Sequence, residues 1–314
     1  MLPSTRAWLQ IHFCVILWGF TAILGKLITL PAATLVWWRM ILVTGALLLF
    51  RGFWNGPRVL TRRQVAIYAV TGAIVALHWL TFYESVKLAN ASVAATCMAL
   101  TPVFVAFVEP WIAKRRFDAR ELIFGIAVIP GVALVVGGTP SGMRMGIAAG
   151  VLSALLVAIF GSLNKRYIGE SSALTVTGIE MAAGAIVMTA LIPLIMSGET
   201  GFARPDLRNA AYLIVLAVGC TLLPFVLSLV ALRHLSAFSS ALAVNMEPVY
   251  SVLLAIVLLG EQRQLDPAFY AGVAVLLIVV FSHPLFVRHP PRADEVMFTD
   301  AAAGVGQPGR DRND

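Results

Sequence analysis

Four ionisable residues of this sequence lie inside long apolar stretches: Arg39, His78, Glu180 and Glu247. A charge at the centre of a bilayer costs at least about 2.5–3.5 kcal/mol on insertion scales, so such a residue usually faces water, a ligand or an opposite charge. Two carboxyl groups, a guanidinium and an imidazole could together bind a small zwitterion or carry a proton. These residues are therefore the first candidates for a functional site.

The two glutamates and the histidine each allow a functional and a structural interpretation. Glu247 could bind a substrate amine or carry a proton, or it could stay protonated and donate to a backbone carbonyl left free by Pro248. Glu180 has no neighbouring proline, so we expect it to face a cavity. His78 has the chemistry of a proton relay near neutral pH, but it could equally be a hydrogen-bonded packing residue.

Arg39 could attract a substrate carboxylate, or it could pair with Glu180 or Glu84 across a helix bundle. Glu84 and Lys87 lie near the end of their apolar segment. They could form a solvated pair or a gate, or they could contact the substrate. Further candidates to line a cavity are Trp18, Trp79, Asn164, Asn245 and Tyr250. The tryptophans could stack on a substrate ring, or pack against lipid and other helices.

The composition indicates a membrane protein. Of 314 residues, 59% are hydrophobic and 12% charged, and the mean hydropathy is +0.87. Soluble proteins average about 45–50% apolar and about 25% charged, so polar surface is too scarce here to cover a globule. This excludes a soluble enzyme, a nucleic-acid-binding module and a secreted disulfide scaffold. The net charge of +7 fits basic cytoplasmic loops rather than nucleic-acid binding.

Ten apolar segments position the candidates, each of about 20 residues, which is the length that crosses a hydrocarbon core of about 30 Å. They cover residues 8–28, 32–51, 64–86, 91–113, 121–139, 144–164, 172–196, 208–232, 236–259 and 266–286. The segment 287–314 has few large apolar residues and is predicted to be a disordered cytoplasmic tail. The fold class expected is an all-α polytopic membrane protein with ten transmembrane helices.

The distribution of basic residues predicts the orientation. With the N-terminus inside, 16 Lys and Arg residues lie on the cytoplasmic side and 6 on the opposite side. Because cytoplasmic loops carry an excess of Lys and Arg, both termini are predicted to lie in the cytoplasm, with the protein in the cytoplasmic (inner) membrane.

The two halves of the chain look like copies of one unit. Residues 91–102 and 237–248 each begin an apolar segment after a short polar turn, and each ends in a proline, Pro102 or Pro248. The implied units are 1–139 and 140–286. Because five is odd, the second unit enters the membrane inverted, as in transporters whose substrate site lies between inverted repeats.

This pattern resembles the EamA-type drug/metabolite transporter superfamily. The resemblance covers about residues 8–286 and is carried by the stretch 77–94, by Glu247-Pro248, and by residues 258–261 (Leu-Leu-Gly-Glu) ahead of Gly272. It implies movement of a small metabolite across the membrane, with export favoured over import, and it leaves the substrate open.

The first half departs from the family pattern. Thr101 replaces glutamate before Pro102, and Glu109-Pro110 follows early, so pairing the halves residue by residue is unsafe there. The resemblance marks Glu261 as a family position. Its place at the end of an apolar segment predicts that it anchors a helix end rather than binds substrate.

The sequence thus predicts a secondary transporter, not an enzyme, that exports an amino acid-like or drug-like solute by alternating access. No phosphate-binding loop or cluster of His, Asp and Glu residues is present, so neither cofactor nor metal is expected. The expected partners are the substrate and the lipid bilayer, without nucleic acid, for a monomer or a homodimer. The alternative is a membrane-embedded enzyme or lipid-processing protein with its site in the helix bundle; a channel fits the inverted repeat less well.

The predicted orientation can be tested with reporter fusions. Fusions at Val287 and in the connection after Lys26 should report from opposite sides of the membrane. A C-terminus on the outer side would contradict the inverted repeat.

Overall fold

All regular elements of the described residues are helical. The computed structural model describes residues 3–49, 60–114, 123, 126–167, 172–196, 199–224, 227 and 246–286. The longer helices are α1 (Pro3–Leu27), α2 (Ala32–Leu48), α4 (Arg62–Leu88), α9 (Arg144–Tyr167), α10 (Ala173–Ile195) and α15 (Pro267–Phe286). The shorter α-helices are α5 (Ala91–Met98), α6 (Thr101–Ala113), α8 (Ile129–Gly137), α11 (Leu207–Ile214) and α14 (Glu247–Leu254). Two π-helical segments continue α11 and α14, namely η5 (Val215–Leu222) and η6 (Ala255–Leu259), and short 3₁₀ turns are η2 (Ser141–Met143), η4 (Glu199–Phe202) and η7 (Glu261–Arg263).

Several of these helices have the length and hydropathy of membrane spans. Within the described ranges, four qualify alone: Thr5–Leu27, Arg62–Leu88, Ser141–Asn164 and Leu174–Ile195. Shorter apolar helices cover Ala32–Leu48, Leu207–Leu222, Glu247–Leu259 and Pro267–Val279. The all-helical membrane class is therefore confirmed, whereas the number of ten spans stays a prediction.

One expected segment, 91–113, is broken rather than continuous. The helices α5 and α6 meet at an angle of 46°. Pro102 lies at the start of α6, where it cannot donate a backbone hydrogen bond and restricts the residue before it. The proline that marks the repeat in the sequence therefore also marks a bend.

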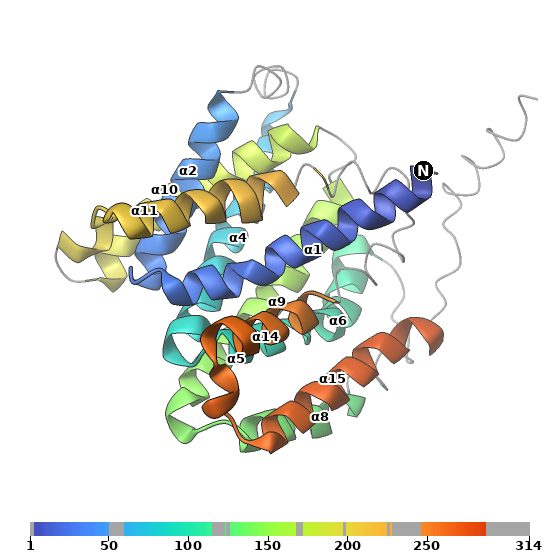
Figure 1. Cartoon of the computed structure of the whole chain (residues 1–314). Helices are drawn as coiled ribbons and strands as arrows, with labels where there is room; N and C mark the ends of the chain where they lie inside the picture. The colour runs from blue at the N-terminus through green and yellow to red at the C-terminus, as the bar shows by residue number, and fades with distance from the viewer. Residues whose placement is uncertain are drawn as a thin grey trace, which may run out of the picture.

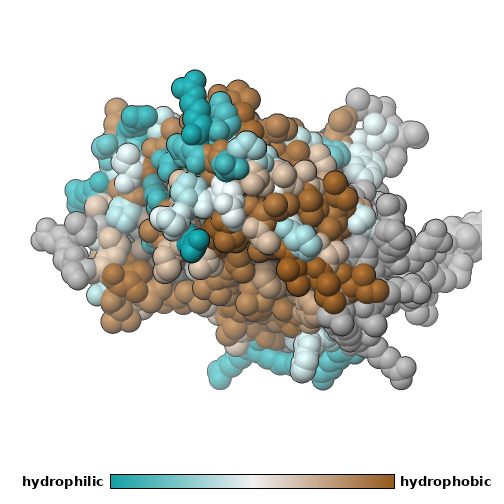
Figure 2. All heavy atoms as spheres, turned by 90° about the horizontal axis from the view of Figure 1, so that it is seen from below, coloured by the Kyte–Doolittle hydropathy of each residue, from teal (hydrophilic) through white to brown (hydrophobic). Residues whose placement is uncertain are grey.

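The outer surface of the bundle is apolar. Large hydrophobic side chains are strongly exposed, among them Trp111, Ile186, Leu194, Val257 and Ile278. Figure 2 shows apolar residues across the middle of one face, with hydrophilic residues gathered toward its upper left and along its lower edge. A soluble protein rarely exposes contiguous apolar area of this extent, so the surface suits contact with lipid.

Helices from the two halves of the chain pack against one another (Figure 1). The helix α4 contacts α9 and α10, α1 contacts α14, and α8 lies beside α15 at one edge of the bundle. At the contact between α4 and α10, a Cβ atom on Gly72 would collide with the backbone of Glu180. The missing side chain thus allows two backbones to approach closely, as small residues do in membrane helix pairs.

Five connections between helices meet at one end of the bundle. They are the segments 28–31, 89–90, 138–140, 199–206 and 260–266. Hydrogen bonds join them or their adjoining helices in the pairs Thr29–Asn209 (2.9 Å), Thr34–Gly201 (2.9 Å), Asn90–Gln264 (3.3 Å) and Gly138–Asp266 (3.1 Å). This end is therefore held together across the halves; that it lies outside stays a prediction from the charge distribution.

The proline-containing helices of the two halves share their start and stop geometry. Pro102 and Pro248 each lie at the first or second helical position. The C-terminal caps that follow, Lys114 (φ 55°) and Gly260 (φ 66°), both have a left-handed backbone conformation. Each lies 12 residues after its proline in the sequence. Glycine adopts this conformation without strain, whereas lysine pays a steric cost.

The left-handed caps predict opposite effects of two substitutions. Gly260→Ala should destabilise the protein by about 1–2 kcal/mol, because no neighbour hinders the new methyl group and backbone strain remains as the cost. Lys114→Gly should stabilise the protein by up to about 1 kcal/mol, since it removes the same strain. Thermal unfolding in detergent measures both. The control Gly45→Ala, which has open space and an ordinary helical φ, should not lower the melting temperature; a loss like that of Gly260→Ala would contradict the explanation.

Candidate functional site

The guanidinium group of Arg39 is buried between three helices. Its side chain, on α2, is 4% exposed. Nε donates to Oγ1 of Thr221 on η5 at 2.8 Å, and a terminal nitrogen donates to the hydroxyl of Tyr83 on α4 at 2.9 Å. The remaining N–H groups make no hydrogen bond to another described residue. Among the described residues, these donors are available for a further acceptor.

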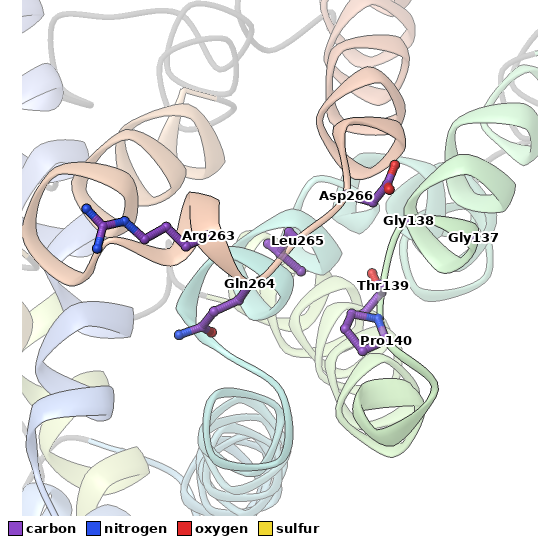
Figure 3. A pocket seen from close by; sticks show the side chains of 8 residues that line it. All are labelled: Gly137, Gly138, Thr139, Pro140, Arg263, Gln264, Leu265 and Asp266. Atoms are coloured by element: carbon purple, nitrogen blue, oxygen red, sulfur yellow. The ribbon is translucent and has the colours of Figure 1, made fainter.

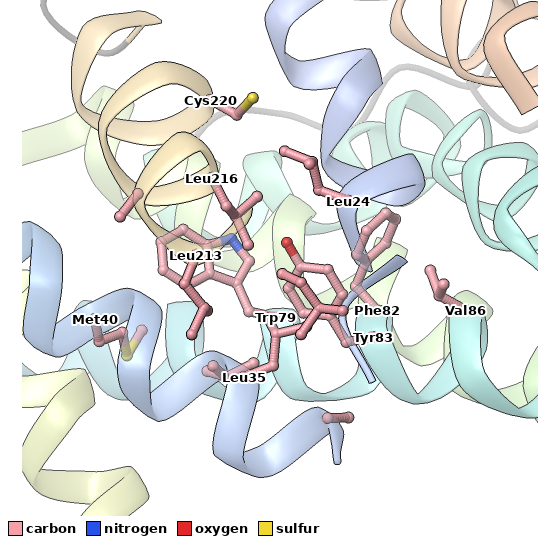
Figure 4. Packing of buried hydrophobic residues seen from close by; sticks show 14 of the residues in the cluster. Leu24, Leu35, Met40, Trp79, Phe82, Tyr83, Val86, Leu213, Leu216 and Cys220 are labelled. Carbon is pink, nitrogen blue, oxygen red and sulfur yellow. The ribbon is translucent and has the colours of Figure 1, made fainter. Parts of the chain in front are cut away.

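An aromatic ring covers the same cation. The guanidinium carbon lies 3.7 Å from the ring centroid of Trp79, and Trp79 itself is 7% exposed. Trp79 and Tyr83 are four residues apart on α4, so they share one helix face. Figure 4 shows both rings beside Leu213 and Leu216 of α11 and η5. A desolvated cation–π contact of this kind contributes about 2 kcal/mol.

The hydroxyl of Thr221 is oriented by the π-helical turn. It donates to the carbonyl of Leu216 at 2.8 Å, five residues earlier, which leaves its lone pairs free to accept from Arg39. Neither Thr221 nor Tyr83 was expected among the site residues. The available signal is that an arginine inside the membrane needs acceptors, and hydroxyl groups in apolar segments are the ones that remain neutral.

Glu247 lies close enough to Arg39 for a Coulomb attraction. It is the first residue of α14 and is half-buried. On the next turn, Ser251 donates to the carbonyl of Gly19 at 3.3 Å, which joins α14 to α1 beside the half-buried Trp18. Tyr250, also half-buried, lies against Gly19. Arg39 and Glu247 therefore interact electrostatically, with no hydrogen bond between these two described side chains.

The interpretation of Arg39 as the ion-pair partner of Glu180 or Glu84 is not realised. Glu180 is 1% exposed, and its Oε2 accepts from Asn164 of α9 at 3.5 Å. The other oxygen, Oε1, has no hydrogen-bond partner. Glu84 is half-buried and interacts electrostatically with Lys87, which donates to the carbonyl of Ile28.

His78 is held by hydrogen bonds between α4 and α9. Its Nδ1 lies 3.0 Å from the carbonyl oxygen and 2.8 Å from the Oγ of Ser153, and that hydroxyl also donates to the His78 carbonyl. The imidazole also lies 5.4 Å from the ring of Phe160. These contacts match the packing interpretation; a relay role stays a prediction. Asn245, the remaining candidate, lies outside the described residues.

Glu261 anchors a helix end, which confirms the expectation from its position. It is 1% exposed, and its carboxylate accepts the backbone N–H groups of Ala91 (2.9 Å) and Ser92 (2.8 Å) at the start of α5. A negative charge at a helix N-terminus is favourable, because it satisfies free N–H groups and opposes the helix dipole. The bond also joins the second half of the chain to the first.

Two further observations bear on other kinds of site. A cavity of about 390 Å³ lies between residues 137–140 and 263–266, at the end where the connections meet, and none of the candidate residues lines it (Figure 3). Among the described residues, no group of three or more His, Cys, Asp or Glu side chains could hold a metal ion.

Comparison with known proteins identifies the family. The model of the EamA-like transporter family matches twice, over residues 6–137 and 144–283. The chain belongs to the EamA-like transporter family. It is therefore a multi-pass membrane protein of a family that transports small solutes.

One relative agrees with this assignment, and one solved structure shares the fold. An uncharacterized transporter of Clostridium kluyveri is 21% identical over 223 residues, which are 68% of this chain and 69% of the relative. A solved crystal structure matches with a TM-score of 0.57 and 17% identity, covering 88% of this chain and 96% of its own. The second likeness concerns the fold alone.

The contacts of Arg39 predict a stability cost for removing its acceptors. Thr221→Val and Tyr83→Phe should each cost about 1–3 kcal/mol, because each leaves a buried charged donor unpaired while keeping the shape of the side chain. Thermal unfolding in detergent measures the loss. Double variants with Arg39→Met test the cause. In the Arg39→Met background, Thr221→Val should cost little stability. The control Tyr68→Phe, which removes a bond to the carbonyl of Tyr167, should cost as much in that background as in the wild type.

Proposed function

We propose that this EamA-like protein is a secondary transporter for a small zwitterionic metabolite of amino acid type. The observation that carries the proposal is the buried Arg39, which two hydroxyl groups hold and whose remaining N–H donors have no partner among the described residues. A substrate carboxylate is the natural acceptor for these donors, since arginine binds carboxylates through two parallel hydrogen bonds.

The residues around Arg39 also suit the amine and the side chain of an amino acid. Glu247, near enough to attract the guanidinium, could accept a substrate amine in its place. Trp79 already covers one face of the cation and offers an apolar wall. A site with a positive and a negative end and an aromatic side suits an amino acid better than a neutral, drug-like solute.

The architecture proposed for this function is ten transmembrane helices in two inverted five-helix repeats, 1–139 and 140–286. Two features support it: the family model matches each half once, and the five described connections meet at one end. Two inverted repeats that rock against each other would expose the site to each side in turn. Both termini, with the tail 287–314, are proposed to lie in the cytoplasm of a cell that exports the solute through its inner membrane.

The test is substrate exchange in proteoliposomes. Vesicles loaded with a mixture of unlabelled amino acids should take up labelled amino acids from that mixture by counterflow, without chemical change to the solute. Arg39→Gln should lower the exchange rate roughly 30-fold or more, as expected when about 2 kcal/mol or more of a buried charge contact is lost. Arg39→Lys should recover part of the loss, because lysine keeps the charge but not the planar donors.

The matched control is Arg208→Gln, which removes a fully exposed arginine and should leave exchange unchanged. Wild-type protein that exchanges no amino acid, or an Arg39→Gln variant that exchanges them normally, would contradict the proposal. Chemical conversion of the solute would instead favour the membrane-embedded enzyme.

A further inference from the structure

Glu180 is a buried carboxyl group with much of its hydrogen-bonding capacity unused. The side chain is 1% exposed, Oε1 has no partner, and Oε2 has one weak contact with the amide of Asn164 at 3.5 Å. An ionised carboxylate at this depth would need several donors or a cation to replace water. The geometry therefore suits the neutral acid.

Several ionisable groups on the elements packed against Glu180 have partners other than its carboxyl group. Arg39 on α2 is bonded to hydroxyl groups, His78 on α4 to Ser153, and Tyr68 on α4 to the carbonyl of Tyr167. The other charged or titratable residues of these elements are Arg62, Arg63, Tyr83, Glu84 and Lys87 on α4, Arg144 at the start of α9, Lys165, Arg166 and Tyr167 at its end, and Glu199 on η4. Among the described residues, Asn164 alone bonds to the carboxyl group of Glu180.

Glu180 also lies at the contact between the two halves of the chain. Its backbone touches α4 at Gly72, and one turn later Gly184 lies against Met40 of α2. Both α2 and α4 belong to the first half, whereas α9 and α10 belong to the second. A movement of one half against the other would therefore open this contact and let water reach the carboxyl group.

We propose that Glu180 and Asn164 form a proton-binding site that couples transport to the proton gradient and is separate from the site at Arg39. Oε1 of Glu180 takes one proton from water on one side of the membrane, which converts the carboxylate to the neutral acid. After the halves move, the same O–H bond breaks and the proton passes to water on the other side. The gradient drives the cycle, and Glu247, which interacts electrostatically with Arg39, remains available to bind the substrate. The coupling part rests on the proposed function, whereas proton binding does not.

Infrared spectroscopy of the full chain in lipid tests proton binding without any substrate. The wild type should show the carbonyl band of a protonated carboxyl group in apolar surroundings, and this band should disappear as the pH is raised. Glu180→Gln should lack the band, and Glu180→Asp should regain it. The matched control Glu247→Gln should keep it. A band that persists in Glu180→Gln, or that is lost in Glu247→Gln, would overturn the assignment.

A second measurement needs no variant. Dicyclohexylcarbodiimide modifies protonated carboxyl groups in apolar surroundings, and mass spectrometry of the labelled wild-type chain locates the product. Labelling of Glu180, weakening at alkaline pH, supports the proposal. Labelling of Glu247 without Glu180 overturns it, even if Glu180→Gln fails to fold.

The coupling is tested in proteoliposomes with an imposed pH gradient. Glu180→Gln should retain counterflow of the amino acid mixture but lose gradient-driven accumulation about tenfold, because exchange needs no net proton movement. Accumulation at the wild-type level in this variant would overturn the coupling. If the wild type shows no counterflow, the proposed substrate is wrong, and the infrared result still decides whether Glu180 binds a proton.

Discussion

The need to satisfy one buried guanidinium group organises the centre of this protein. Inserting an arginine at the middle of a membrane helix costs about 2.5–3.5 kcal/mol, and a hydrogen bond from a charged donor returns about 1.5–3 kcal/mol. The hydroxyl groups of Thr221 and Tyr83, with the ring of Trp79, are therefore sufficient to hold Arg39. They do so without neutralising it. A cation held by neutral groups keeps its attraction for an anion, which a tight ion pair would lose.

The same requirement explains why α2, α4 and η5 meet where they do. Arg39 cannot be satisfied by its own helix, because the backbone carbonyls there are already bonded to backbone N–H groups. Acceptors must come from neighbouring helices, and the π-helical turn at Thr221 supplies one by directing its hydroxyl hydrogen back to Leu216. Such π-helical turns are often found at functional sites. The contact of α2, α4 and η5 and the polar groups at that contact thus both follow from the hydrogen-bonding needs of Arg39.

Much of the fold could be predicted from the sequence, because the length of an apolar segment and the turn-forming residues that end it are local properties of the chain. The described bounds of α9 and α10 fall within a few residues of the expected segments, and the anchoring role of Glu261 followed from its position at a segment end. The grouping of the site residues was harder. Sequence reasoning grouped Glu180 and Glu247 as candidates for one functional site, yet their described partners differ: Asn164 bonds to Glu180, whereas Arg39 interacts electrostatically with Glu247. Depth along a helix can be counted, but the neighbour that a side chain faces depends on tertiary packing.

The hydrogen bonds at the end of the bundle where the connections meet are easier to replace than those around Arg39. At the end where the connections meet, the buried Glu261 binds the N–H groups of α5. Opening this end would admit water that can replace that carboxylate, so it costs only the net worth of each hydrogen bond, about 0.5–1.5 kcal/mol for a neutral pair and somewhat more for a charged acceptor. Around Arg39, which is 4% exposed, the described acceptors are the hydroxyl groups of Thr221 and Tyr83. A movement that disturbs those bonds therefore needs a substitute acceptor, and a substrate carboxylate is one. In the proposed transporter this requirement would link substrate binding at Arg39 to movement of the halves, because the ligand would supply the hydrogen bonds that the moving helices give up.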